Sequence, residues 1–235
     1  MNSAEVFSFE YDMLTRTSAF ARSLAWFRSN ATRAAAHRQL MLELDHLINV
    51  HLRLREVAAK VVPSEDWSAW QELLAVPALS FDKSRPFLSD LRSIGLNALE
   101  SVSLTPLPQT IAMEAYAHFQ LQEREAVGLV GYLWFFERMP RLLYPLWNES
   151  CRRGGVHEQA LRALAEGAVV DAGRDNQFAA CCRQVVRRPR DLGLATQSLQ
   201  VTMELFATLL DSALQRVERR HVSPLGVSAG IGQVA

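Results

Sequence analysis

The distribution of glycine restricts the fold of this chain more than any other feature. None of the 11 glycines precedes Gly95, although tight hairpin turns depend on glycine. The nine prolines fall mostly between segments whose apolar residues recur at helical spacing. No stretch rich in β-branched residues alternates apolar and polar side chains with a period of two. These patterns predict an all-α protein.

The apolar periodicity predicts a single bundle of about seven helices. Residues 1–222 are expected to form this domain, because no repeat, linker or low-complexity segment divides them. Residues 223–235, with one proline and three glycines, are expected to be a disordered tail. The predicted helices are Ala4–Ser29, Thr32–Val61, Ser64–Leu74, Ser84–Ser101, Gln109–Arg138 with a continuation Arg141–Arg153, Val156–Arg187 and Arg190–His221.

Charge and cysteine content exclude several classes of protein. The 25 basic and 25 acidic side chains cancel, which argues against a nucleic-acid partner held by bulk electrostatics. Three cysteines without a CxxC pair indicate a reducing cytoplasm rather than a disulfide framework. Residues 1–27 lack the pattern of a signal peptide, and the apolar run Ala126–Phe136 is too short to span a bilayer. We therefore expect a soluble cytoplasmic protein with no membrane partner.

Two aspartates interrupt the apolar stripe of the predicted helix Val156–Arg187. Asp171 and Asp175 lie one turn apart between Leu164 and Phe178. Two like charges on a buried face repel each other and lose hydration, so they need a compensating cation or proton. A metal ion is one such cation. The alternative is an arginine, either Arg174 or one from another helix, in a structural network.

Three further acids and histidines are candidate metal ligands. Glu114 and His118 lie one turn apart and can ligate the same ion, unless they belong to a solvated face. Glu137 ends the most apolar segment of the chain, Val127–Phe136, and therefore needs a partner. That partner is either Arg138 or Arg141 in a structural pair, or a ligand.

A competing set of ligands lies on the predicted helix Thr32–Val61. Glu43 and His46 form an ExxH pattern, the spacing with which some bundle helices present a carboxylate and an imidazole to iron. His51 falls on the apolar stripe, where a buried, hydrogen-bonded histidine is the structural alternative to a ligand. Cys182 also lies on an apolar stripe, which favours packing over a nucleophilic role.

From Glu125 to Asp175 the pattern resembles the haem-oxygenase-like diiron oxidases and oxygenases, also described as iron-containing redox enzymes. Their hallmark is an apolar helix that ends in Glu near a Pro, about thirty residues before a helix with His and Asp ligands one turn apart. Glu137 and Pro140 look like the first part, and Asp171 and Asp175 occupy positions similar to the second. The chain departs from the pattern where it has Asp171 for a common His and Phe178 for a second one.

The resemblance implies a haem-oxygenase-like bundle that binds two Fe(II) ions and uses O₂ as co-substrate. The implied metal ligands are Glu137, Asp171 and Asp175, completed by Glu114 and His118 or by the competing set with Glu43 and His46. The implied substrate is a small amino-acid-like or fatty-acid-like metabolite. Tyr132 and Phe136 would then line an apolar substrate pocket, although both also suit the core.

Two other functions remain open at this point. The same superfamily includes thiaminase-like and quinone-cofactor-synthesis proteins that need no metal, so one alternative is a metal-free enzyme of the same bundle. The other is a non-catalytic binding or scaffold protein whose buried acids are paired with arginines. A homodimer is also left open.

Overall fold

The computed structural model describes residues 2–75, 86–95, 105–122, 125–167 and 172–222, and every regular element among them is helical. The predicted all-α class is therefore confirmed. Residues 223–235, predicted to be a disordered tail, lie outside the described residues. None of the described helices is both long and apolar enough to cross a membrane.

The helices follow one another with short connections. The elements are α1 (Ser3–Thr17), α2 (Ala19–Ser29), α3 (Ala34–Val61), α4 (Trp67–Leu74), α5 (Pro86–Ser93), α7 (Pro108–Gln122), the 3-10 turn η1 (Ala126–Gly128), α8 (Leu129–Arg153), the 3-10 turn η2 (Glu158–Ala160), α9 (Arg162–Gly167), α10 (Ala172–Val185) and α11 (Pro189–Val222).

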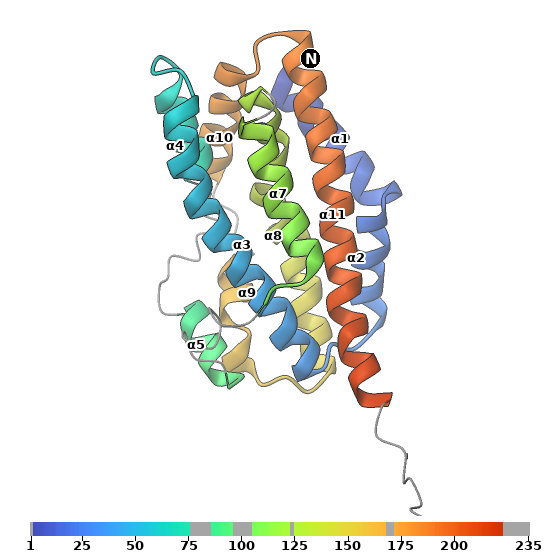
Figure 1. Cartoon of the computed structure of the whole chain (residues 1–235). Helices are drawn as coiled ribbons and strands as arrows, with labels where there is room; N and C mark the ends of the chain where they lie inside the picture. The colour runs from blue at the N-terminus through green and yellow to red at the C-terminus, as the bar shows by residue number, and fades with distance from the viewer. Residues whose placement is uncertain (1, 76–85, 96–104, 123–124, 168–171, 223–235) are drawn as a thin grey trace, which may run out of the picture.

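The core forms around α8, which α11, α2, α7 and α9 surround (Figure 1). Every residue of its first two turns, Leu129–Phe136, is buried. Phe135 and Phe136 meet Phe20 of α2 and Phe206 of α11 in edge-to-face contacts, an arrangement that aromatic rings prefer. The most apolar segment of the sequence is thus the centre of the bundle.

Gly131 lets α11 approach α8 closely. A Cβ atom at this position would clash with the backbone carbonyl of Ala195 and lie 2.6 Å from the backbone nitrogen of Leu199. The two long helices therefore contact each other through backbone atoms at this point.

The predicted first helix, Ala4–Ser29, is wrong in one respect, because it breaks at Ser18. This residue has an extended backbone with φ −84° and ψ 178°. The hydroxyls of Thr15 and Thr17 donate to backbone carbonyls one turn earlier. Such side-chain bonds compete with the helical ladder and favour an end at this point. Two shorter helices, α1 and α2, result.

The prediction for Gln109–Arg138 is also wrong. α7 ends at Gln122, and Glu125 has an extended backbone before a new helix begins. That helix, α8, continues through Pro140 and Pro145, where the sequence predicted an interruption. Proline removes one backbone donor, but the surrounding side chains of α8 are buried and hold the helix together. Glu114 and Glu137 consequently lie on different helices.

The predicted helix Val156–Arg187 corresponds to η2, α9 and α10. Residues 168–171 between α9 and α10 lie outside the described residues, and Asp171 is one of them. The predicted helix Arg190–His221 is confirmed as α11.

Candidate functional site: an arginine–carboxylate cluster

The structure brings Glu137 of α8 and Asp175 of α10 to the same place in the bundle. Glu137 is the first residue of α8 after its apolar run, and its side chain is 3% exposed. Asp175 lies in the first turn of α10. Both carboxylates contact the guanidinium of Arg141. The sequence therefore correctly placed an acid of each helix together, but with arginine between them.

Three arginines hold the two acids. Arg141 donates to both carboxylate oxygens of Asp175 and lies 3.8 Å from Glu137. Arg174 Nε lies 3.4 Å from a carboxylate oxygen of Glu137, and Arg138 lies 3.6 Å from Asp175. We call Glu137, Arg138, Arg141, Arg174 and Asp175 the arginine–carboxylate cluster. Among the described residues it contains one more cation than anions.

Burial affects the charges of this cluster. Loss of hydration raises the pKa of Glu137, and the pull of Arg174 and Arg141 in the other direction does not cancel this effect. The side chains of the three arginines are about one fifth exposed. The cluster is thus embedded in the bundle and still reaches solvent.

Several buried donors beside the cluster lack an acceptor among the described residues. They are the hydroxyl of Tyr11, the indole nitrogen of Trp134 and Nε of Arg138. The Arg138 guanidinium lies 4.9 Å from the Trp134 ring centre, a cation–π contact. The Tyr11 hydroxyl feels the charges of Arg138 and Arg141. This part of the bundle is therefore rich in donors.

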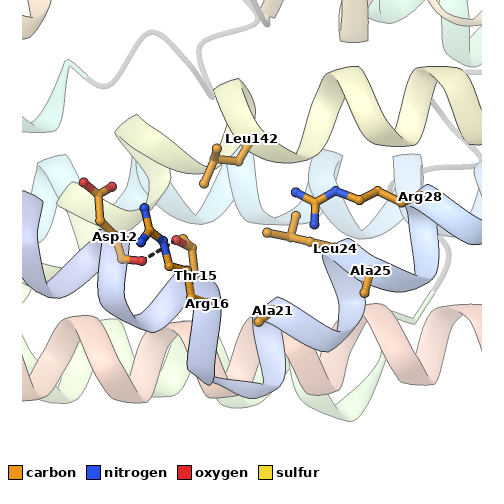
Figure 2. A pocket seen from close by; sticks show the side chains of 8 residues that line it. All are labelled: Asp12, Thr15, Arg16, Ala21, Leu24, Ala25, Arg28 and Leu142. Carbon is orange, nitrogen blue, oxygen red and sulfur yellow. Dashed lines mark hydrogen bonds between the residues drawn. The ribbon is translucent and has the colours of Figure 1, made fainter.

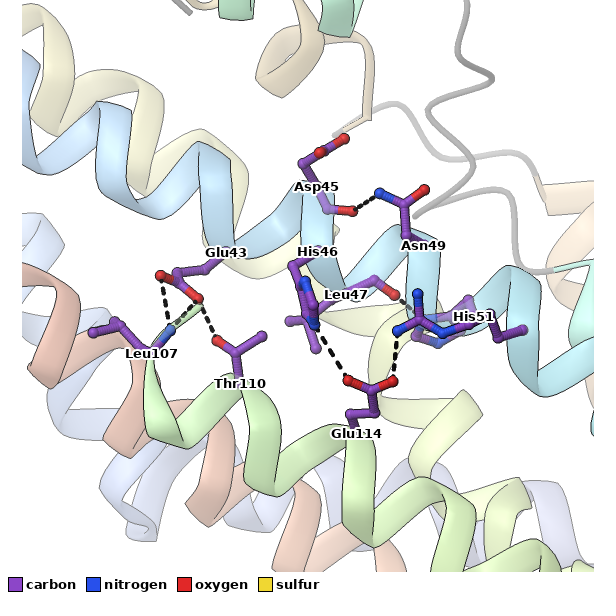
Figure 3. Close-up of polar contacts among 10 residues, drawn as sticks. Glu43, Asp45, His46, Leu47, Asn49, His51, Leu107, Thr110 and Glu114 are labelled. Carbon is purple, nitrogen blue, oxygen red and sulfur yellow. Dashed lines mark hydrogen bonds and ion pairs between the residues drawn. The ribbon is translucent and has the colours of Figure 1, made fainter. Parts of the chain in front are cut away.

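A second polar network joins α3 to α7 (Figure 3). His46 Nε2 lies 3.2 Å from one carboxylate oxygen of Glu114, and Arg53 donates to the other. Burial acts to raise the pKa of Glu114, but the hydrogen bonds from Arg53 and His46 outweigh it, and the pKa lies below its usual value. His46 was predicted only in the competing set, and it takes the place expected for His118. His118 is half-buried on α7 and is not among the partners of Glu114 in the described part of the chain.

Glu43 has a structural role at the start of α7. Its carboxylate accepts hydrogen bonds from the backbone nitrogen of Leu107 at 3.1 Å, from the hydroxyl of Thr110 and from the amide of Gln39 (Figure 3). The first backbone nitrogens of a helix have no partner within it, so a buried carboxylate there stabilises the helix end. These donors occupy the oxygens that a metal would need.

His51 is buried in the core, as the structural alternative predicted. Its Nδ1 donates to the carbonyl of Leu47 at 2.8 Å, and its ring stacks on Tyr132 at 5.2 Å and meets Phe136 edge-on. Burial lowers the pKa of His51 to about 4, so the ring is neutral at physiological pH. Tyr132 and Phe136 are completely buried, and their predicted contact with a substrate stays a prediction.

Cys182 is also buried, and burial raises the pKa of its thiol. Nucleophilic cysteines are exposed and have a lowered pKa. The prediction that Cys182 is a packing residue is therefore supported by its surroundings.

The described residues do not form a donor set that fits iron. No three His, Cys, Asp or Glu side chains among them gather in a group able to hold a metal ion. At the cluster, a divalent cation would face three permanent guanidinium charges and no histidine. At Glu114, Arg53 already occupies one carboxylate oxygen. Because Asp171 lies outside the described residues, iron binding stays a prediction.

The sequence pointed to both acids of the cluster but not to the part played by their arginines as a group. The spacing of Arg138 and Arg141 after Glu137 was a usable signal, because i+1 and i+4 neighbours can both reach a carboxylate at a helix end. The pairing of His46 with Glu114 had no such signal, since the two residues lie on helices 68 positions apart.

Comparisons with known proteins agree on the fold. No family model and no curated protein sequence matches the chain. Among solved structures, a domain of unknown function with a haem-oxygenase-like fold from Shewanella denitrificans is similar, with a TM-score of 0.74 and 16% sequence identity over 94% of each chain. At this identity the likeness concerns the fold alone. The chain therefore has a haem-oxygenase-like fold, as the resemblance in its sequence implied.

Proposed function

We propose that the chain is a metal-independent binding protein that takes a small organic carboxylate at the arginine–carboxylate cluster. The observation that carries this proposal is an excess of buried donors and positive charge around Glu137 and Asp175. This function belongs to the third class that the sequence left open, a binding protein whose buried acids are paired with arginines.

The charges of the cluster favour an anion. Guanidinium groups keep their proton at all physiological pH values, so Arg138, Arg141 and Arg174 carry three positive charges against the two carboxylates. The raised pKa of Glu137 means that this acid can take up a proton, which increases the excess. A carboxylate ligand compensates it.

The unpaired donors favour a ligand with acceptor oxygens. A buried donor without an acceptor costs about 1–3 kcal/mol, and Tyr11, Trp134 and Arg138 each contribute one among the described residues. A carboxylate has two acceptor oxygens and binds guanidinium groups through two parallel hydrogen bonds. The partial exposure of the arginines gives such a ligand a route from solvent.

Calorimetric titration tests this function. Acetate and malonate are the carboxylate probes, acetamide is the neutral analogue, and phosphate is the inorganic anion. Arg138→Gln removes one guanidinium without breaking the bonds between Arg141 and Asp175. Arg152→Gln, on the same helix but exposed and paired with Glu158, is the matched control.

We expect saturable binding of a carboxylate and none of acetamide. Arg138→Gln should weaken this binding about tenfold or more, because a hydrogen bond to a charged group is worth about 1.5–3 kcal/mol. Arg152→Gln should leave it unchanged. The proposal is wrong if neither carboxylate binds, if phosphate alone binds, or if both variants bind as the wild type does.

A further inference from the structure

A groove on the surface of the bundle lies between α1, α2 and α8 (Figure 2). It has a volume of about 540 Å³, which is within the size range of pockets for small molecules. It shares no residue with the arginine–carboxylate cluster. The lining residues are Asp12, Thr15, Arg16, Ala21, Leu24, Ala25, Arg28 and Leu142.

The break between α1 and α2 and the small residues of α2 create this groove. The extended backbone of Ser18 separates the helix that carries Arg16 from the helix that carries Arg28. Ala21 and Ala25 lie one turn apart on α2 and leave the space above them open. Leu24 is buried, and Leu142 of α8 is 36% exposed. The floor of the groove is therefore apolar.

The charged residues of the groove are not paired with each other. The ion pairs of the described residues involve other arginines than Arg16 and Arg28. Figure 2 shows Arg16 at the same end as Asp12 and Thr15, whereas the guanidinium of Arg28 extends over Leu24 toward Leu142. Two cations and one acid give the lining a single positive charge, and Arg28 is the cation with no acid beside it in the lining.

We infer that this groove binds an organic monoacid with an unbranched apolar body, with its carboxylate on Arg28 and its alkyl part along Leu24 and Leu142. The single positive charge of the lining matches one carboxylate. An arginine at one end fixes the orientation of the acid through charge-assisted hydrogen bonds. The apolar floor loses contact with water when the alkyl part covers it.

Titration with octanoate tests this site in the full-length protein. Arg28→Gln removes the cation that holds the carboxylate. Arg22→Gln is the matched control, because Arg22 is exposed on the same helix and does not line the groove. Ala25→Leu fills the groove without changing its charge. 1-Octanol is the neutral ligand of similar shape.

We expect octanoate to bind the wild type and Arg22→Gln equally, and both Arg28→Gln and Ala25→Leu about tenfold more weakly. Octanol should bind more weakly than octanoate. The inference is overturned if octanoate does not bind saturably, or if Arg28→Gln and Ala25→Leu leave its affinity unchanged.

The same titration separates this groove from the arginine–carboxylate cluster. Arg138→Gln should leave octanoate binding unchanged, and acetate should not compete with it. Loss of octanoate binding in Arg138→Gln with retention in Arg28→Gln would place the acid at the cluster and refute the groove.

Discussion

The guanidinium of Arg141 donates to both carboxylate oxygens of Asp175 and thereby joins α8 to α10. The same guanidinium lies 3.8 Å from Glu137, one turn earlier on its own helix. One arginine therefore compensates two acids of different helices. This relationship leads to a stability prediction that differs from the one for a metal site.

Asp175→Ala should lower the free energy of unfolding by about 2–4 kcal/mol, because removal of one partner leaves partly buried guanidinium charges uncompensated. Replacing both partners, as Arg141→Met with Asp175→Leu, should restore part of this loss. Urea denaturation followed by circular dichroism measures both values. Glu149→Ala, which removes an exposed ion pair with Arg153, should change the free energy by less than about 1 kcal/mol. Equal effects of Asp175→Ala and Glu149→Ala would contradict the pairing.

Glu43→Ala should destabilise the start of α7. The substitution leaves the backbone nitrogen of Leu107 and the hydroxyl of Thr110 buried without their acceptor, at a cost of about 2–3 kcal/mol in the free energy of unfolding. Thr110→Val removes one donor and its need for an acceptor together, so its effect should be smaller. A Glu43→Ala protein that is as stable as the wild type would show that the carboxylate does not stabilise the helix end.

Two buried histidines should make the protein less stable in mild acid. Burial lowers the pKa of His37 and of His51 to about 4, below the ordinary value of about 6.5 in the unfolded chain. Above pH 6.5 both states are neutral. As the pH falls from about 6.5 to 4, the unfolded chain takes up protons that the folded protein does not, so stability falls by at most about 3 kcal/mol for each histidine.

Thermal unfolding between pH 7.5 and pH 4.5 checks this dependence. His51→Leu should flatten the decrease of the midpoint, and substitution of the exposed His157 by Ala should not. Asp90 acts in the opposite direction, because burial raises its pKa to about 6 and the folded protein then binds a proton before the unfolded chain does. A midpoint that rises steadily as the pH falls would contradict the prediction for the histidines.

Gly131→Ala and Gly128→Ala should differ strongly in stability. The new methyl group at Gly131 meets the backbone of α11 at Ala195 and Leu199, which cannot move without separating two long helices. At Gly128 it meets the flexible end of the Gln120 side chain. We expect a loss of several degrees or more in the unfolding midpoint for Gly131→Ala and a small change for Gly128→Ala. Similar midpoints for the two variants would refute the close approach of the helices.

The sequence predicted the class of the fold because its evidence is local. The absence of glycine before Gly95 and the periodicity of apolar residues both depend on the conformation of neighbouring residues. Its errors lie where longer-range packing decides the outcome. Pro140 and Pro145 are helix breakers by local preference, but the buried surroundings of α8 keep the helix continuous.

The candidate site was predictable only in part for the same reason. Glu137 and Asp175 stood out because acids beside apolar stripes need a partner, and both have one. Which cation they meet depends on the arrangement of α8 against α10, and the periodicity of each helix does not contain it. His46 and Glu114 likewise belonged to separate predicted sets, and the packing of α3 on α7 joined them.

Anaerobic loading with Fe(II), removal of unbound metal and elemental analysis test most directly whether arginine takes the place of the cation in this bundle. We expect iron at the background level, and an unfolding midpoint that neither Fe(II) nor Mn(II) changes. Stoichiometric iron that is retained by the wild type and lost in Glu137→Ala and Asp175→Ala, with the helical circular dichroism preserved, would contradict the metal-independent function.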